Sequence, residues 1–332
     1  MNFGFTDDQL ALAATVRDVL RAHCPPAALR SERRPAWEQL AALGFFGLLL
    51  PPEADGLGLG LTDVLPALEE TGRACLPGPV VETAVVAPSL LPGAPKLASG
   101  TVCVGVLPPG QAYAADADLA DLLVVVRDGG ARLVAGESVR LAARAGVDPC
   151  RPLFEVAFDT SEPLDGPLGG PLGGSPAVSV EAALWRGTVA TAAQLVGVAR
   201  ELLAVTVSYA RARTQFGAAI GSFQAVKHQL ADVAVAVEFA APLVHRAALT
   251  VDGAVPSAGR DVSAAKAAAG EAATLAARVA LQVHGAIGYT EELDLRFWLA
   301  RAWSLSAAYG TTAAHREHLR SEIVGGSPRR YP

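Results

Sequence analysis

Three long, alanine-rich segments in the second half of the chain limit its possible fold more than any other feature. They cover residues 180–212, 221–252 and 257–283, and only short breaks separate them. Segments of this length and mixed polarity are typical of helices that pack against one another. They therefore predict a helical bundle over residues 179–332.

The first part of the chain, residues 1–97, also reads mostly as helix. Thr6 and Gln9 form a capping-box pattern, and apolar residues then recur at helical spacing as far as Pro25. A breaker-rich loop over residues 51–60 is followed by a further helical pattern. We therefore expect an N-terminal helical domain.

The chain changes character over residues 98–162, where short β-branched runs replace the helical period. These runs cover residues 101–106, 122–126, 131–134 and 154–158. The turn Asp128-Gly129-Gly130 separates two of them, which is a hairpin signal. A Pro- and Gly-rich linker at 163–178 cannot be regular structure. The expected fold class is mainly α with a small β middle domain.

Charge and composition exclude several classes of partner. The chain of 332 residues has 27 Lys and Arg against 33 Asp and Glu, a net charge of -6, which argues against nucleic acid or an anionic membrane. No apolar stretch approaches the ~18 residues that would span a bilayer, and no signal peptide is visible, so we expect a cytoplasmic protein. The four cysteines are widely spaced, which indicates neither a metal site nor a disulfide framework.

An arginine followed by a Phe-Gly break lies between the first two long helical segments. The stretch runs Arg213-Thr-Gln215-Phe216-Gly217, and an arginine at such a corner offers a fork of donors that suits a phosphate or pyrophosphate. A second break, at Gly285, follows the third helical segment. The structural alternative is that Arg213 caps a helix C-terminus and Gly285 merely ends a helix.

The order of helical domain, β-domain and bundle, together with several local motifs, resembles the acyl-CoA dehydrogenase family. Arg213–Asp232 reads R-x-Q-F-G-x-x-I-x-x-F-Q-x-x-x-H-x-L-A-D, and Gln282–Thr290 resembles Q-x-x-G-G-x-G-Y-T. Trp37–Leu48 and Glu69–Arg73 resemble N-terminal stretches of the same family. The resemblance covers nearly the whole chain apart from the middle domain, and it implies a C-terminal four-helix bundle.

The resemblance also implies FAD as cofactor and an acyl-CoA thioester as substrate. In this family the bundle of one subunit completes the FAD site of its neighbour, with the arginine at the pyrophosphate. Carried over to this sequence, the expected FAD contacts are Arg213, Gln215, Phe216, Gly217, Gln224, Gln282, His284, Gly285 and Thr311.

The sequence departs from the family in the middle domain. The family carries a T-E-x-x-x-G-S-D-like loop and a W-x-T/S strand that hold the flavin ring and line the acyl-CoA cleft. Residues 105–116 contain neither pattern, and no tryptophan occurs between Trp37 and Trp185. A complete flavin cradle from this chain alone is therefore not expected.

The second departure is the catalytic base. The family usually places a glutamate in a Y-E-G-T turn, where this chain has Tyr309, and an unperturbed phenol with a pKa of about 10 is a poor base at neutral pH. A second family position for the glutamate corresponds to Gly187. Glu291 and Glu292 are weak candidates for a relocated base, although they suit the start of a helix equally well. The expectation is that no catalytic residue stands at the usual position.

These departures resemble the degenerate subunit of the heteromeric α2β2 acyl-CoA dehydrogenases of bacterial steroid catabolism. That resemblance implies a second acyl-CoA dehydrogenase subunit as partner, which supplies the catalytic glutamate and most of the acyl-CoA pocket. Two alternatives stay open. The chain could be a homomeric enzyme with Glu291 or Glu292 as base, or a flavin-free scaffold on the same fold.

Overall fold

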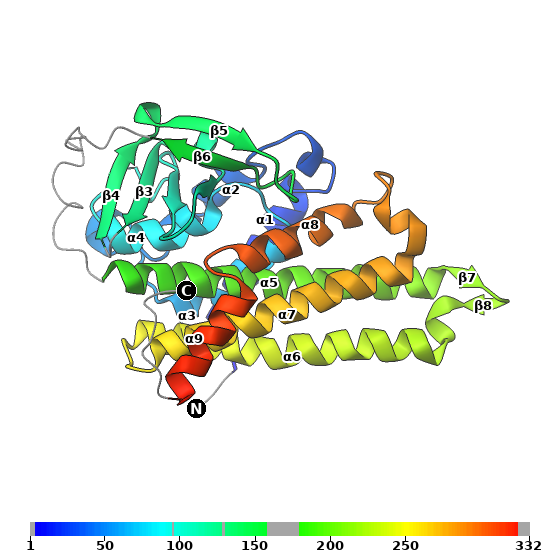
Figure 1. Ribbon diagram of the computed structural model, residues 1–332. Coiled ribbons are helices and arrows are strands. Elements are labelled where there is room, and N and C mark those ends of the chain that lie inside the picture. The colour runs from blue at the N-terminus through cyan, green and yellow to red at the C-terminus, as the bar shows by residue number, and fades with distance from the viewer. Residues whose placement is uncertain (1–3, 95, 128–129, 158–178, 325–332) are drawn as a thin grey trace.

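The computed structural model describes residues 4–94, 96–127, 130–157 and 179–324, and the 163–178 linker lies outside them. Helices come first, two small sheets follow, and a helical bundle completes the chain (Figure 1). The N-terminal helices are α1 (Asp7–His23), α2 (Trp37–Ala42), α3 (Leu61–Arg73) and α4 (Ala87–Leu90). The expected fold class is confirmed.

The first helix begins where its sequence signal predicts. The Thr6 hydroxyl accepts from the backbone N–H of Gln9, and the Gln9 side chain accepts from the backbone N–H of Thr6. Two of the unpaired N–H groups at the helix start are thus satisfied. The helix ends at His23, just before Pro25.

The middle domain contains two three-stranded sheets. In the first, β3 (Leu122–Arg127) lies between β1 (Val104–Leu107), to which it is parallel, and β4 (Gly130–Ala135), to which it is antiparallel. The antiparallel pair agrees with the hairpin signal. In the second sheet, β6 (Leu153–Ala157) pairs antiparallel with β2 (Tyr113–Ala115) and β5 (Arg140–Arg144). Sequence reasoning missed β2 and β5, which are short and carry no run of β-branched residues.

Three long helices form the body of the bundle. They are α5 (Val180–Ala212), α6 (Gln224–Asp252) and α7 (Ala258–His284), close to the expected bounds, and α8 (Leu295–Ala307) and α9 (Thr312–Val324) pack against them. The sheets lie over one end of α5, whereas the hairpin of β7 (Thr214–Gln215) and β8 (Ala218–Ala219) forms the opposite tip (Figure 1). The two ends of the bundle therefore differ in structure.

Two glycines let α3 and α5 approach backbone to backbone. A Cβ added to Gly72 would lie 2.1 Å from the carbonyl oxygen of Gln194, and one added to Gly197 would lie 2.0 Å from that of Glu69. No other residue fits at such distances. This close contact joins the N-terminal domain to the bundle.

The expectation that no segment is long and apolar enough to span a membrane was wrong. Helices α5 and α6 both meet that test, with mean hydropathies of 1.3 and 1.4 in their most apolar windows. The window in α5 is 72% buried inside the protein and the one in α6 is 39% buried. Length and composition alone are weak evidence for a span, since core helices of soluble proteins pass the same test.

Candidate functional site

The predicted phosphate-binding arginine lies at the far tip of the bundle. Arg213 is the C-cap of α5, and a two-residue turn at Phe216 and Gly217 joins β7 to β8. Both turn residues have positive φ, 54° and 78°, as a tight hairpin of this kind requires. Arg213, Gln215 and Gly217 are exposed, and Phe216 is 93% exposed. The motif is thus presented to the outside of the molecule.

A stacked pair of rings brings the two predicted cofactor segments together. The rings of Tyr209 and His284 stack with centroids 4.1 Å apart. Arg213 follows one turn after Tyr209 and donates its backbone N–H to the Tyr209 carbonyl at 2.8 Å, while Gly285 directly follows His284. Arg213 and Gly285 therefore lie at the same end of the bundle, as the cofactor prediction requires. Gly285 has a φ of 67° and open space beside its Cα.

The other predicted cofactor residues divide between two places. Gln224 begins α6 and Gln282 lies in the last turn of α7, both exposed. His284 is instead buried, and its Nδ1 donates to the Ala280 carbonyl at 2.7 Å while burial lowers its pKa. These contacts make His284 a packing residue within this chain. Thr311 precedes α9, where its hydroxyl accepts from the backbone N–H of Ala314, in the turn that carries Tyr309.

Tyr309 lies in a cleft between the sheets and the bundle, at the opposite end from the hairpin. The side chain is 3% exposed, and its hydroxyl donates to Oε1 of Glu82 at 3.2 Å. Its ring lies against Gly187 of α5. The two positions where the family places its base thus meet in space, and neither carries a carboxylate in this chain.

The Tyr309 turn is fixed by two buried titratable side chains. Nζ of Lys266 donates to the carbonyls of Ser306 and Gly310 at 3.1 and 3.0 Å, and Nε2 of His315 donates to the Tyr309 carbonyl at 2.8 Å. Burial lowers the pKa of Lys266 to about 7, and burial together with Lys266 lowers the pKa of His315 to about 4. These bonds hold a turn in which Tyr309 has a φ of 52° and Gly310 one of 97°.

A buried ion pair joins the three parts of the chain beside the cleft. Nε of Arg301 in α8 lies 2.5 Å from Oδ2 of Asp148 in the middle domain, and both side chains are at most 3% exposed. Nη1 of Arg301 also donates to the Leu76 carbonyl at 2.7 Å. Because Asp148 lies so close, the pKa of Arg301 is raised despite its burial. The pair fixes the middle domain against both helical domains.

Glu291 and Glu292, the candidates for a relocated base, lie on an exposed loop before α8. The Glu291 side chain is 86% exposed and accepts from Nη1 of Arg296 at 2.8 Å. Neither residue lines the cleft around Tyr309. A base must lie within hydrogen-bond reach of the proton that it removes, so the structure gives neither residue that role in this chain's own cleft.

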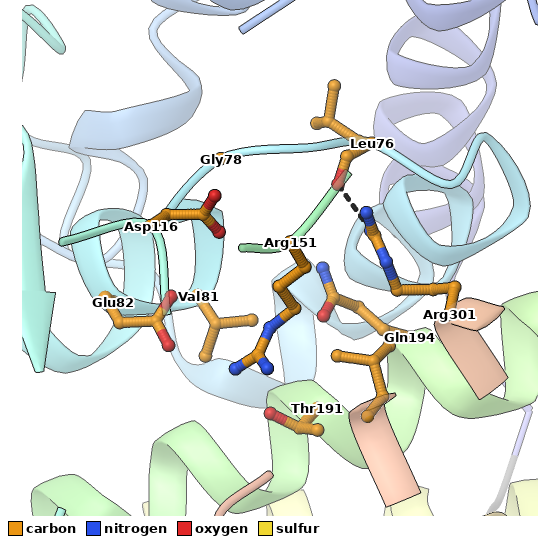
Figure 2. A pocket seen from close by; sticks show the side chains of 10 residues that line it. Leu76, Gly78, Val81, Glu82, Asp116, Arg151, Thr191, Gln194 and Arg301 are labelled. Carbon is orange, nitrogen blue, oxygen red and sulfur yellow. Dashed lines mark hydrogen bonds between the residues drawn. The ribbon is translucent and has the colours of Figure 1, made fainter. Parts of the chain in front are cut away.

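Three ionisable residues of the cleft were missed by sequence reasoning. Glu82 begins a π-helical turn over Glu82–Val86, Asp116 follows β2 with a φ of 51°, and Arg151 precedes β6. Figure 2 shows their side chains around one small cavity. Asp116 is 2% exposed, and burial raises its pKa to about 7 although Arg33 donates to it at 3.1 Å. No spacing in the sequence links these residues, because tertiary contacts alone bring them together.

The hairpin and the cleft differ in how well they suit a flavin cofactor. Arg213 takes part in no ion pair within the described residues, so its guanidinium is free to bind a pyrophosphate. The cleft has a volume of about 190 Å³, below the range of roughly 300–1,000 Å³ that is usual for ligand sites. The residues present therefore fit the phosphate end of FAD at the hairpin, but not a flavin ring together with a thioester in the cleft.

The order of helical domain, β-domain and bundle defines a class of protein: the helix–sheet–bundle scaffold of the flavin-dependent dehydrogenases. Residues 6–96 match the acyl-CoA dehydrogenase N-terminal domain, and residues 178–324 match the acyl-CoA dehydrogenase C-terminal domain. The chain is also 30% identical to acyl-CoA dehydrogenase IpdE2 of Mycobacterium tuberculosis, over 96% of this chain and 98% of that protein. The chain belongs to the acyl-CoA dehydrogenase family.

Solved structures share the fold. A glutaryl-coenzyme A dehydrogenase in complex with glutaryl-CoA has a TM-score of 0.85 and 22% identity, covering 100% of this chain and 99% of that chain. The ChsE4-ChsE5 complex from Mycobacterium tuberculosis has a TM-score of 0.83 and 22% identity, covering 98% of this chain and 100% of that chain. These matches agree with the domain order described above.

Proposed function

We propose that this chain is the non-catalytic subunit of a heteromeric, FAD-dependent acyl-CoA dehydrogenase. In this proposal its hairpin completes the FAD site of a partner subunit of the same family. The partner supplies the catalytic carboxylate and most of the pocket for the acyl-CoA thioester. The assembly is an α2β2 tetramer, and a steroid side-chain CoA is the proposed substrate.

The observation that carries the proposal is the separation of the two half-sites. The exposed arginine hairpin follows the C-terminal end of α5, whereas the ring of Tyr309 packs on Gly187 near the N-terminal end of the same long helix, so the two sites lie at opposite ends of the bundle. One copy of this chain therefore cannot bring Arg213 to a ligand in its own cleft, and the hairpin needs a second subunit to act on. A second copy of this chain would offer only a cleft without the usual glutamate, so a different subunit is the better partner.

Two of the structures with a similar fold support the same proposal. The ChsE4-ChsE5 structure is a complex of two differently named chains. A second neighbour in fold, the Tcur3481-Tcur3483 variant, is named a steroid acyl-CoA dehydrogenase and likewise pairs two differently named chains. These likenesses motivate both the heteromeric assembly and the steroid substrate.

Each residue of the hairpin region has a defined part in this proposal. The guanidinium of Arg213 would bind the pyrophosphate through a fork of donors, and the open backbone at Gly285 would allow close approach. Gln215, Gln224 and Gln282 are exposed amides that would donate further hydrogen bonds. The chemistry that FAD would supply in the partner's cleft is acceptance of a hydride from the β-carbon of the acyl group.

The deciding experiment compares the chain alone with the chain co-expressed with an acyl-CoA dehydrogenase encoded beside it. We expect a colourless lone chain and a yellow complex with one FAD per heterodimer, measured from the flavin spectrum and the protein concentration. Stoichiometric FAD on the lone chain would refute the shared site. A colourless complex that still forms would instead favour a flavin-free scaffold.

A further inference from the structure

The cleft contains two neighbouring cavities of different character, and the side chains of Glu82 and Arg151 line both. The inner one measures only about 20 Å³ and is lined by polar side chains, among them Glu82, Asp116, Arg151 and Thr191 (Figure 2). The outer one measures about 190 Å³, and Glu82 and Arg151 line it as well. Most of its walls are apolar: Val106, Pro108, Tyr113, Leu153, Trp303 and Ala307.

Arg151 has a guanidinium that the chain leaves largely unused. Within the described ranges, Arg151 donates one hydrogen bond, to the hydroxyl of Ser304 at 3.3 Å, and takes part in no ion pair. The guanidinium thus shares the inner cavity with Glu82 and Asp116 without pairing with either one. A polar space of about 20 Å³ is the size that one water molecule or one hydroxyl group occupies.

The charges around this space select the chemistry of a group that could fill it. Arg301 and Asp148 neutralise each other as a buried pair, and Arg33 is shared between Asp116 and Asp118. Arg151 therefore faces two acidic groups: Glu82, which accepts from the Tyr309 hydroxyl, and Asp116, whose pKa burial raises to about 7. A carboxylate in the space would face Glu82, and an ammonium would face Arg151. A hydroxyl group can accept from Arg151 and donate to Glu82 at the same time.

We propose that this cleft binds a neutral, mainly apolar molecule that carries one hydroxyl group. The apolar body lies in the outer cavity among Trp303, Tyr113 and Leu153, and the hydroxyl lies in the inner cavity between Arg151 and Glu82. An engineered cavity of about 150 Å³ accepts benzene, so the outer cavity has room for one six-membered ring. The site does not depend on the hairpin or on the proposed partner.

The test uses three probes that share a ring and differ in the head group: cyclohexanol, cyclohexanecarboxylate and cyclohexylamine. Each is titrated into the full chain at neutral pH, and binding is followed by ligand-observed NMR. We expect cyclohexanol to bind at least about tenfold more tightly than the two charged probes, since each of these would place a charge against a like charge. Equal binding of all three, or no binding to the folded chain, would overturn the proposal.

Two variants locate the hydroxyl. Arg151→Leu should weaken cyclohexanol binding about tenfold or more, because it removes a hydrogen bond to a charged group. The control is Arg140→Leu, which changes an exposed arginine of β5 and should have no effect on binding. Glu82→Gln keeps the shape of the cavity but leaves Arg151 without its opposite charge. This variant should therefore bind cyclohexanecarboxylate more tightly, relative to cyclohexanol, than the parent chain does. An unchanged preference in a folded Glu82→Gln variant would also overturn the proposal.

Discussion

The ring of Tyr309 occupies the space into which a side chain at Gly187 would project. A Cβ added to Gly187 would lie 2.8 Å from Cε1 and 3.0 Å from Cζ of Tyr309. With Tyr309 in this position, any side chain larger than glycine at position 187 would overlap its ring. The two positions are therefore coupled by packing.

This relationship predicts that Gly187→Ala destabilises the chain. The added methyl group would also lie 2.8 Å from Cγ2 of Val86, and overpacking of this kind costs about 1–3 kcal/mol. Urea unfolding of the variant measures the cost. The matched control is Gly93→Ala, because open space surrounds Gly93. A Gly187→Ala chain as stable as the control would show that Tyr309 moves aside easily.

Arg213→Ala should leave the fold intact and weaken FAD binding in the complex with the partner. The side chain is exposed, so the melting temperature should stay within error, while loss of a charge-assisted bond of about 1.5–3 kcal/mol raises the Kd for FAD about tenfold to a hundredfold. Fluorescence titration of the apo-complex with FAD gives the affinity. Arg211→Ala, an exposed arginine two residues earlier, should retain normal affinity. Equal FAD affinities of the two variants would show that Arg213 does not bind the cofactor.

Asp148→Asn should be among the most damaging polar substitutions in the chain. The substitution leaves Arg301 buried without an opposite charge. Such a loss lowers the free energy of unfolding by about 3–5 kcal/mol. Thermal unfolding followed by circular dichroism provides the measurement. The exposed pair of Arg144 and Glu155 serves as control, since Glu155→Gln should cost less than about 1 kcal/mol. Similar losses in both variants would argue against a special role for the buried pair.

The chain should lose stability to protonation of His315 as the pH falls from 6.5 to 4. The folded state lowers the pKa of His315 from 6.5 to about 4, so the unfolded state binds the proton first in this window. Protonation of Asp116 has the opposite effect on stability as the pH falls. Its pKa is raised in the folded state, so the folded chain binds this proton first between pH 7 and 3.8. The difference between the parent chain and a His315→Gln variant isolates the histidine.

That difference should shrink as the pH falls, because only the parent chain carries the histidine whose protonation opposes folding. His23→Gln, at an exposed position, is the control and should track the parent chain at every pH. Melting temperatures of the three chains at pH 6.5, 5.5 and 4.5 measure this difference. A constant gap between the parent and His315→Gln would mean that His315 does not titrate in this range.

Local sequence signals were enough to predict most of the architecture. The capping box at Thr6 and the alanine-rich period of the long helices act over a few residues, and the structure has those elements close to the expected bounds. The sequence also marks Arg213 and Gly285 as residues at helix ends, where the structure has them, while their role in cofactor binding stays a prediction. Glu82, Asp116 and Arg151 could not be found, since they come from three separate elements and meet only through tertiary packing.

Phe216 has a consequence for a cell that makes this chain. Its aromatic ring is 93% exposed at the tip of a hairpin, and chaperones and proteases can recognise such an exposed apolar group. In the proposed assembly the partner covers this ring, so only unassembled copies display it. Surplus copies would then be cleared selectively, and the supply of the partner would set the amount of this chain without any dedicated regulator.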